Sequence, residues 1–561
     1  MYIMSKKENV QQRKTPLKNN TAQVAQPGLF EKLDRWFEKN DKKMFYLTLF
    51  LSTLVSVLLF DSKVSPGGDD SSYIERAWNF LHNHKFPYFQ GPAYPVFLSV
   101  FVKIFGLNVI ALKSFSLLCQ LGFVFFTYKA FVKRIPYSVL YSLLFFISFN
   151  NYIQYYSSQT FTETFFLFLQ SIAIYLTFKL IDTIDKNHSW VEGFKKNYLK
   201  WLAFGVLFVL LSLAKSVAFA SIIGVIGYFI LNKNYKQVIY ALVAFIAVRM
   251  LYQLIITSIY GPNTSDQMEL LLRKDLYKPE GGHEDFAGMI NRFFNNFNTY
   301  ISLHMYRLMN LRKTDTLLSI PALSYISSII IGICTFLSYK RNKYVFFSGI
   351  YFILLSVGIF FGVQASNMQD RLIIIVMPFI FIVLFYGVYE LTKKFPGIQY
   401  AFVLFSGIML LVTIGKTAVL AKENVSALKK NLSGDIYYGY TPDWENFLKM
   451  SKYCADSLPS TVGKLSRKPN MSFIYSNGRS FVGQYITTTT DADSVLMTWK
   501  KNNVSYIVLA KLRKDPRKNN GEVINTIHRM LGPVYQKYPQ RVKLVKTIGT
   551  LESCELYQLT N

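Results

Sequence analysis

The chain has 561 residues, of which 51% are hydrophobic and 17% aromatic. Repeated, nearly uncharged stretches of about 17 to 25 residues exclude a soluble globular protein and indicate a polytopic membrane protein. The formal net charge of +29 could suggest nucleic-acid binding, but the basic residues are spread through loops and tails and form no basic–aromatic module. Loops that follow the positive-inside bias and lie against anionic lipid explain much of this charge.

The N-terminal segment 1–43 is polar and basic, and it lacks the apolar core of a secretory signal peptide. We expect a disordered cytoplasmic tail that ends in an interfacial helix, FEKLDRWFEKNDKK. The apolar segment that follows then serves as the first membrane anchor.

Apolar segments predict a polytopic α-helical membrane protein with about 11 transmembrane helices. With the N-terminus inside, the short basic loops between them all fall on the cytoplasmic side. Residues 201–232, interrupted by Lys215, fit either one long tilted helix or a hairpin of two short helices; a single helix would invert everything downstream. The predicted spans are 44–60, 109–132, 136–152, 161–181, 201–214, 216–232, 236–258, 316–338, 344–363, 371–392 and 398–420.

This topology makes 44–420 a transmembrane module, whose long polar loops 61–108 and 259–315 face outward together with the segment 421–561. The last segment alternates helical patterns with the short β-rich runs MSFIYS, VSYIVLA, RVKLVKTIGT and CELYQL, which predicts a small extracytoplasmic α/β domain. We therefore expect a multi-pass protein of the plasma (inner) membrane.

The four cysteines fall into two pairs. Cys119 and Cys334 lie within apolar spans and are expected to be packing residues. Cys454 and Cys554 share the outward segment, an oxidising side, where a disulfide would close a loop of about 100 residues. Whether they form that disulfide or stay reduced is left open by the sequence.

Two adjacent carboxylates, Asp69 and Asp70, follow the first apolar span in the run GGDDSSYIERA. The two glycines allow unusual backbone angles, and Tyr73 and Ala77 come next at helical spacing. A half-desolvated carboxylate at the membrane surface suits a general base that takes a proton from a hydroxyl. The alternative is a solvated interfacial turn, which is also the favoured interpretation of His82 and His84 over a metal site.

Among the ionisable residues in or between the predicted spans, three stand out: Glu163, Lys215 and Arg371. Such residues are costly in a membrane and indicate function. Arg371 could present a bidentate fork to a phosphate, and Lys215 could add a point charge. A snorkelling Arg, a Lys at a hairpin tip and a helix-cap Glu are the structural alternatives.

The chain contains neither GxxxxGK nor a strand-linked GxGxxG motif, which argues against soluble nucleotides as substrates. Energy for a reaction must then come from a group already in the membrane. A lipid-phosphate-linked group meets that demand, because its phosphate leaves from the interface while an acceptor arrives from the water.

Several motifs together resemble the GT-C glycosyltransferases, in particular the protein O-mannosyltransferase and aminoarabinose transferase group. Two differences from the family pattern are an Asp in place of Glu at position 70 and a missing proline after Lys215. The outward segment SRKPNMSFIYSNGR is also similar to that of bacterial members. The motifs are DDSSYIERA, PYFQGPAYPVFL, TETFFLFL around Glu163, LAKS at Lys215 and QDRLIIIVMPF around Arg371.

The resemblance implies a GT-C fold and an inverting transfer of one sugar from a polyprenyl-phosphate carrier to an acceptor hydroxyl on the extracytoplasmic face. It implies Asp69 as the catalytic base, accompanied by Asp70 and Glu163, and Lys215 and Arg371 as donor-phosphate contacts. No metal or other cofactor is expected, with a divalent cation as the alternative. The residues expected to shape the substrate site are Tyr73, Arg76, Tyr94 and Tyr155.

The expected partners are a polyprenyl-phosphate-linked sugar donor, a glycan, lipid or protein acceptor, and membrane lipids, but not nucleic acid. A transporter or flippase of a polyprenyl-linked glycan is the alternative function, since short and broken spans also occur in such proteins. A non-catalytic membrane scaffold is a third hypothesis.

Overall fold

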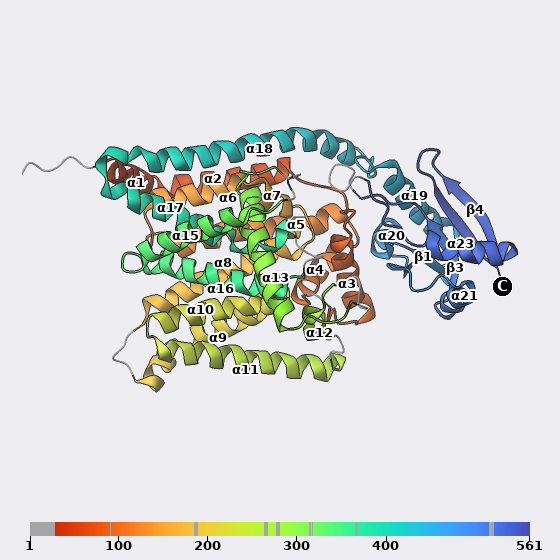
Figure 1. Cartoon of the computed structure of the whole chain (residues 1–561), viewed down its shortest axis with the longest axis horizontal. Helices are drawn as coiled ribbons and strands as arrows, with labels where there is room; N and C mark the ends of the chain where they lie inside the picture. The colour runs from red at the N-terminus through yellow and green to blue at the C-terminus, as the bar shows by residue number, and fades with distance from the viewer. Residues whose placement is uncertain are drawn as a thin grey trace, which may run out of the picture.

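Long helices lie side by side along one direction in the computed structural model, and a smaller domain with a sheet sits at one end of them (Figure 1). Residues 1–27 of the predicted tail lie outside the described part of the chain. The structure describes residues 28–89, 91–184, 189–262, 267–275, 281–313, 316, 318–364, 369–514 and 521–560.

The chain enters through α1 (Leu29–Lys39) and α2 (Asp41–Leu58), at the end opposite the sheet (Figure 1). α1 is amphipathic, and its buried Phe30 packs edge-on against Tyr389 with ring centroids 4.9 Å apart. Asp34 accepts a hydrogen bond from the Tyr389 hydroxyl at 2.7 Å. These contacts hold α1 against the ends of the membrane helices, where an interfacial helix belongs.

Each predicted span coincides with a helix, but only eight helical runs in the described residues are long and apolar enough to cross a membrane. α6 and α10 are shorter, and α2 begins with three charged residues, Asp41, Lys42 and Lys43. The helices are α2, α5 (Val109–Phe131), α6 (Tyr137–Phe149), α8 (Thr162–Asp182), α9 (Trp190–Ala214), α10 (Phe219–Leu231), α11 (Tyr235–Tyr260), α15 (Pro321–Ser338), α16 (Lys343–Gly362), α17 (Met377–Lys394) and α18 (Tyr400–Leu432).

The break at Lys215 separates two helices that form a hairpin, which is one of the two arrangements that the sequence allowed for residues 201–232. α9 ends at Ala214, Lys215 has extended backbone angles (φ −149°, ψ 136°), and a 3-10 turn, Ser216–Ala218, leads into α10. α9 also packs closely on α11, since a Cβ at Gly205 would lie 2.5 Å from the Ala244 carbonyl oxygen. The single tilted helix, and the inverted topology that would follow from it, are therefore wrong.

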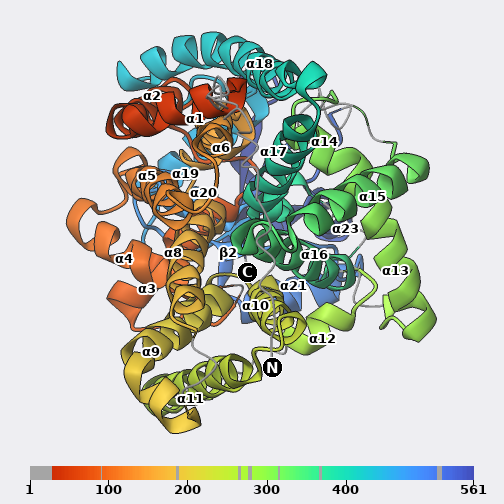
Figure 2. The same cartoon turned by 90° about the vertical axis from the view of Figure 1, so that its left-hand side faces the viewer.

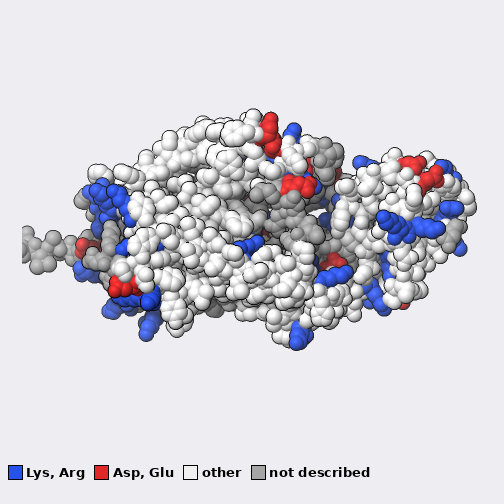
Figure 3. Space-filling model, turned by 90° about the horizontal axis from the view of Figure 1, so that it is seen from below, with Lys and Arg blue, Asp and Glu red and all other residues white. Residues whose placement is uncertain are grey.

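The predicted cytoplasmic loops meet at the end of the helices opposite the sheet. Arg134 pairs with Asp182 at 2.7 Å, and Lys343 pairs with the same carboxylate at 3.3 Å. Figure 3 shows Lys and Arg gathered at the two ends of the molecule, with a largely uncharged band between them. This distribution fits helices that cross a membrane.

Seen end-on, α8, α16 and α17 lie toward the middle, whereas α4 (Ala93–Phe105), α11, α15 and α18 lie at the periphery (Figure 2). Cys119 and Cys334 are buried among these helices, which confirms the packing role predicted for them. Cys334 also fixes a close approach of α15 to α17, because a Cβ at Gly387 would lie 2.3 Å from its sulfur.

Short helices carry the loops at the sheet end. α3 (Asp69–Asn83) packs beside α4, and a π-helical turn links α13 to α14. Two 3-10 turns precede α17. These elements are α3, α4, α7 (Asn151–Tyr156), α12 (Gln267–Leu272), α13 (Phe286–Thr299), the turn Tyr300–His304, α14 (Met305–Leu308), η5 (Asp370–Leu372), η6 (Ile374–Val376) and, at the other end, η7 (Pro396–Ile398).

The C-terminal domain is the predicted α/β domain, reached through α18, which continues to Leu432. Its five-stranded sheet has the order β2-β1-β3-β5-β4; β1 is parallel to β2 and β3, and β5 is antiparallel to β3 and β4. The elements are α19 (Pro442–Ser457), β1 (Gly463–Ser466), α20 (Pro469–Tyr475), β2 (Val482–Gly483), α21 (Ala492–Lys501), β3 (Val504–Leu509), α23 (His528–Lys537), η8 (Pro539–Arg541), β4 (Val542–Ile548) and β5 (Cys554–Leu559).

The run MSFIYS, predicted as a strand, is instead part of α20. Pro469 stands in the first turn, where proline favours a helix. The run is also too short for periodicity to separate a strand from a buried helix. Cys454 on α19 and Cys554 on β5 are both buried, and both are free thiols.

Candidate active site

Asp69 is the first residue of α3 and faces the ends of the membrane helices. Gly68 precedes it with a left-handed φ of 87°, a conformation that glycine adopts without steric cost. The side chain of Asp69 is 46% exposed, and its carboxylate lies 2.6 Å from a guanidinium nitrogen of Arg371. Gly68 thus turns the chain so that the carboxylate points toward a cation from a distant segment.

Arg371 lies in η5, just before α17, and contacts two carboxylates. Besides Asp69, it approaches Glu163 with its Nε 3.9 Å from Oε1. Its guanidinium also lies over the ring of Phe161, 5.5 Å from the centroid. A guanidinium held between an aromatic face and carboxylates has its fork preorganised.

Glu163, in the first turn of α8, is buried and accepts a hydrogen bond from the Lys215 ammonium at 2.7 Å. The four residues Asp69, Arg371, Glu163 and Lys215 therefore alternate in charge along one chain of contacts, the charge cluster. They come from four separate segments, and each was a candidate from the sequence. The structure brings all four together.

Two atoms of the charge cluster are buried without a hydrogen-bond partner among the described residues: Oε2 of Glu163 and Nε of Arg371. Buried polar atoms are usually satisfied. Strain, a catalytic role, or a water or ion account for such unsatisfied atoms in folded proteins.

Asp70 points away from the charge cluster into the protein. Its carboxylate accepts hydrogen bonds from the backbone N–H groups of Ser65 at 2.7 Å and Ser71 at 2.8 Å. Burial raises the pKa of Asp70 to about 6, although the nearby cation Lys113 opposes the rise. The second acid of the pair therefore ties down the loop in front of α3.

Lys113 of α5 is a buried cation that the sequence analysis missed. It donates to the Asp61 carbonyl at 2.7 Å and to the Gln159 side chain at 3.3 Å, and also to the carbonyl of Lys63. Lys113 lies within the predicted span 109–132, so the rule on ionisable residues in spans would have found it. It anchors the segment that leads to Asp69.

The four residues expected to shape the substrate site have different environments. Tyr73 stacks edge-on against Tyr94 at 5.3 Å, and the Arg76 guanidinium lies 4.7 Å from the Tyr73 ring centroid. Tyr94 is fully buried and shares a hydrogen bond with Ser116 at 3.2 Å. Tyr155, in contrast, is 40% exposed. Tyr94 therefore supports Tyr73 from behind, whereas Tyr155 is open to contact.

The C-terminal domain also contributes a cation to this region. Lys468 donates a hydrogen bond to the Gly67 carbonyl at 2.9 Å. Burial, and then its neighbour Arg467, lower the pKa of Lys468 to about 8. The ring of Phe473 contacts Trp78 of α3 at 6.1 Å. No charge rule for membrane spans could have found Lys468, because it lies outside them.

A second polar group lies next to Arg371. Asp370 contacts His304 from the π-helical turn and pairs with Arg307 at 3.3 Å. π-helical turns occur frequently at functional sites, because they turn a side chain out of the α-helical register. His304 and Arg307 fix Asp370, and with it the turn that carries Arg371.

The carboxylates here face cations or backbone amides. Over the described ranges, no group of three or more His, Cys, Asp or Glu side chains could hold a metal ion. His82 stacks near Trp78 at 4.0 Å and ends α3 together with His84.

No protein-family model and no curated protein sequence matches this chain. Its structure is similar to that of the oligosaccharyltransferase of Archaeoglobus fulgidus in complex with Zn and sulfate, with a TM-score of 0.54 and 14% identity over 82% of this chain and 68% of that chain. It is also similar to the oligosaccharyltransferase AglB of the same species, in complex with an inhibitory peptide and a dolichol-phosphate. For AglB the TM-score is 0.53 and the identity 13%, over 94% of this chain and 75% of that chain.

A third similar structure is ArnT from Cupriavidus metallidurans in the apo state. The TM-score is 0.53 and the identity 11%, over 91% of this chain and 97% of that chain. At such low identities the similarity establishes a shared fold.

Proposed function

Given the GT-C fold that this chain shares with AglB and ArnT, we propose that it is a membrane glycosyltransferase. It moves a sugar from a polyprenyl-phosphate carrier to an acceptor hydroxyl, with inversion at the anomeric carbon. The observation that carries this proposal is the charge cluster, in which Asp69 lies 2.6 Å from Arg371 and Glu163 lies 2.7 Å from Lys215 at the ends of apolar helices.

Arg371 and Lys215 are assigned to the donor phosphate. A guanidinium and an ammonium at membrane depth stabilise a phosphate that leaves from the lipid interface. The Nε of Arg371 is buried beside Glu163, so a phosphate would meet the guanidinium on the side that contacts Asp69. The dolichol-phosphate bound to AglB supports a lipid phosphate as the ligand of this fold. Glu163 is assigned to hold Arg371 and Lys215 close enough together for both to contact one phosphate.

Asp69 is assigned as the general base. It takes the proton of the acceptor hydroxyl while that oxygen forms a bond to the anomeric carbon and the bond to the donor phosphate breaks on the opposite face. In the free protein Arg371 engages the Asp69 carboxylate. A phosphate that binds Arg371 competes for this contact and leaves Asp69 available to the acceptor, so donor binding precedes base action.

The remaining assignments concern the surroundings of the base. Asp70 is proposed as the anchor of the loop rather than as a second base, since backbone N–H groups occupy its carboxylate. Tyr73, Arg76 and Tyr155 are assigned to the acceptor side, and Tyr94 to the support of Tyr73. We place this site and the C-terminal domain on the extracytoplasmic side of the plasma membrane.

The test is transfer by the purified full chain with a panel of polyprenyl-phosphate-linked radiolabelled hexoses and pentoses and cell-envelope glycan as acceptor. Asp69→Asn should lower turnover by about a hundredfold to ten-thousandfold, since it removes the base. Asp182→Asn is the matched control, because it removes a carboxylate that pairs with Arg134 at the opposite end.

Turnover that survives in Asp69→Asn would contradict the proposal, provided that both variants elute as folded protein in size-exclusion chromatography. Translocation of the labelled lipid across sealed vesicles without a new glycosidic product would instead indicate the transporter alternative.

A further inference from the structure

The C-terminal domain presents an exposed aromatic ring on the side that faces the membrane helices. Tyr485 follows β2 and is 50% exposed. Its hydroxyl donates a hydrogen bond to the Asn470 side chain at 3.1 Å. A Cβ at Gly483 would lie 2.9 Å from the ring. The glycine therefore leaves room for the ring, and the hydrogen bond holds the hydroxyl in place.

The ring is also held by its neighbours in the domain. The Arg467 guanidinium lies 5.5 Å from the ring centroid, and its Nε donates a hydrogen bond to the Ile524 carbonyl at 3.0 Å. Pro469 lies on the same side as the ring, since the Cβ at Gly483 would also come within 3.0 Å of it. These contacts orient the ring and leave the rest of it open to solvent.

Helix α20 brings this ring close to α3, the helix that begins with Asp69. Lys468, just before α20, donates a hydrogen bond to the Gly67 carbonyl at 2.9 Å. Phe473 on α20 contacts Trp78 on α3, with ring centroids 6.1 Å apart. The two helices therefore lie side by side at the junction of the two domains (Figure 1).

Glu75 lies on α3 between these two contacts. Its side chain is half-buried, and it forms no hydrogen bond or ion pair within the described part of the chain. Burial raises the pKa of Glu75, although Arg76 opposes the rise. Burial also raises the pKa of Tyr485, and the negative charge of Glu75 raises it further, so the carboxylate lies near the phenol.

An exposed ring beside a carboxylate matches the surface of a saccharide. The faces of a sugar carry C–H groups, which suit the electron-rich face of an aromatic ring. The hydroxyl groups of a sugar donate hydrogen bonds, and a carboxylate has two oxygens that accept them. An acyl chain at the same place would bury Glu75 without a donor, which is unfavourable.

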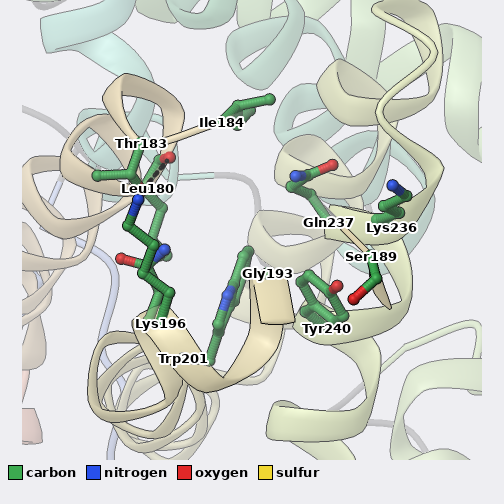
Figure 4. A pocket seen from close by; sticks show the side chains of 11 residues that line it. Leu180, Thr183, Ile184, Ser189, Gly193, Lys196, Trp201, Lys236, Gln237 and Tyr240 are labelled. Carbon is green, nitrogen blue, oxygen red and sulfur yellow. Dashed lines mark hydrogen bonds between the residues drawn. The ribbon is translucent and has the colours of Figure 1, made fainter. Parts of the chain in front are cut away.

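The surface formed by Glu75 and Tyr485 lies within reach of the proposed base. Glu75 is six residues after Asp69 on the same helix, a rise of about 9 Å. An acceptor whose hydroxyl meets Asp69 would therefore place a neighbouring sugar beside Glu75. The hollow between α8, α9 and α11 cannot serve the acceptor in this way, because it lies at the end of the helices opposite the C-terminal domain (Figure 4).

We propose that Glu75 and Tyr485 bind a saccharide unit of the acceptor, so that the acceptor is a glycan of more than one sugar. Tyr485 stacks against a face of this unit, Glu75 accepts hydrogen bonds from its hydroxyls, and Asn470 keeps the phenol in position. The inference rests on the proposed transfer reaction, but the binding of the saccharide can be measured without a donor.

The experiment measures binding of the purified full chain to an array of oligosaccharides and Ser- and Thr-rich peptides. The unaltered chain should bind oligosaccharides. Tyr485→Leu should bind them about tenfold more weakly, whereas Tyr485→Phe keeps the ring and should bind nearly as well. Glu75→Gln should also lose about tenfold, because hydrogen bonds to a charged group are weakened. The matched control is Tyr535→Leu, which removes a tyrosine of 52% exposure from α23.

Transfer from the labelled donor gives a second readout. Tyr485→Leu should raise KM for the acceptor about tenfold and leave KM for the donor unchanged. Binding of peptides in place of oligosaccharides, or equal losses in Tyr485→Leu and Tyr535→Leu, would overturn the inference. If Tyr485→Leu fails to fold, Glu75→Gln decides. Saccharide binding that depends on Tyr485 in a chain without transfer activity would contradict the proposed function and leave the saccharide site established.

Discussion

Arg371 connects the two carboxylates of the charge cluster, Asp69 at 2.6 Å and Glu163 at 3.9 Å, while its guanidinium covers the ring of Phe161. These contacts use the planar, multidentate shape of the guanidinium as well as its charge. A lysine would keep the charge but could not donate hydrogen bonds to both carboxylates in the same directions. The residue type therefore matters at this position.

Arg371→Lys tests that conclusion. We expect transfer to fall by about tenfold to a hundredfold, since hydrogen bonds to charged groups contribute about 1.5–3 kcal/mol. The affinity for the polyprenyl phosphate should fall in parallel, as measured by competition with the labelled donor. Arg341→Lys, which alters a pair with Glu390 at the opposite end, should leave both quantities unchanged. A lysine variant with full activity would remove Arg371 from the phosphate site.

Asp70 predicts a pH dependence of stability. The pKa of Asp70 is about 6 in the folded chain against 3.8 for an aspartate in the unfolded chain, so the folded state binds the proton more tightly. The stabilisation of the folded state by protonation of Asp70 is fully present below pH 3.8 and is lost as the pH rises through 6. The difference between the two pKa values corresponds to about 3 kcal/mol in the free energy of unfolding. On going from pH 7 to pH 5, Tm of the unaltered chain should rise relative to that of Asp70→Asn, whose amide does not titrate.

At the scale of the element, the start of α3 decides where Asp69 points. Gly68 has φ 87°, whereas its neighbour Gly67 is not in the left-handed region. Gly68→Ala should cost about 1–2 kcal/mol in strain and displace the base, so that Tm and transfer both fall. The backbone at Gly67→Ala stays unstrained, although its Cβ would lie 3.2 Å from the Ser65 hydroxyl. Equal effects of both substitutions on transfer would show that the left-handed turn does not aim Asp69.

The break between α9 and α10 is a second element that builds the site. Lys215 stands between the two helices with an extended backbone, and from this position its ammonium reaches Glu163 at the start of α8. Continuous helix would have kept the lysine inside the membrane span. The hairpin thus places a cation at the same level as Asp69 and Arg371.

At the scale of the whole molecule, the C-terminal domain contacts the loop before α3 through Lys468 and Gly67. Because burial lowers the pKa of Lys468 to about 8, holding an ammonium there is unfavourable. Lys468→Met should leave Tm unchanged or raise it, while transfer falls roughly tenfold through the lost loop contact. Lys452→Met on the exposed face of α19, where the lysine pairs with Asp456, serves as the control. A parallel loss of Tm and transfer would indicate a purely structural role.

Much of this architecture could be predicted from local properties of the chain. Hydropathy runs identify membrane helices without knowledge of their partners, and the rule on charges in spans selected Glu163, Lys215 and Arg371. The motif around Asp69 resembled the GT-C glycosyltransferases, and the similarity to AglB and ArnT confirms the GT-C fold. The basic loops predicted which helix ends lie together, as the pairs of Asp182 with Arg134 and Lys343 show.

Contacts between distant segments could not be predicted in the same way. Hydropathy did not choose between one helix and two at Lys215, did not separate Asp69 from Asp70, and did not find Lys468. Each of these outcomes depends on which groups from other segments lie within a few ångströms: Glu163 for Lys215, the Ser65 backbone for Asp70, and the Gly67 carbonyl for Lys468. Burial and pairing are properties of the packed chain, so only the folded arrangement assigns each charge its partner.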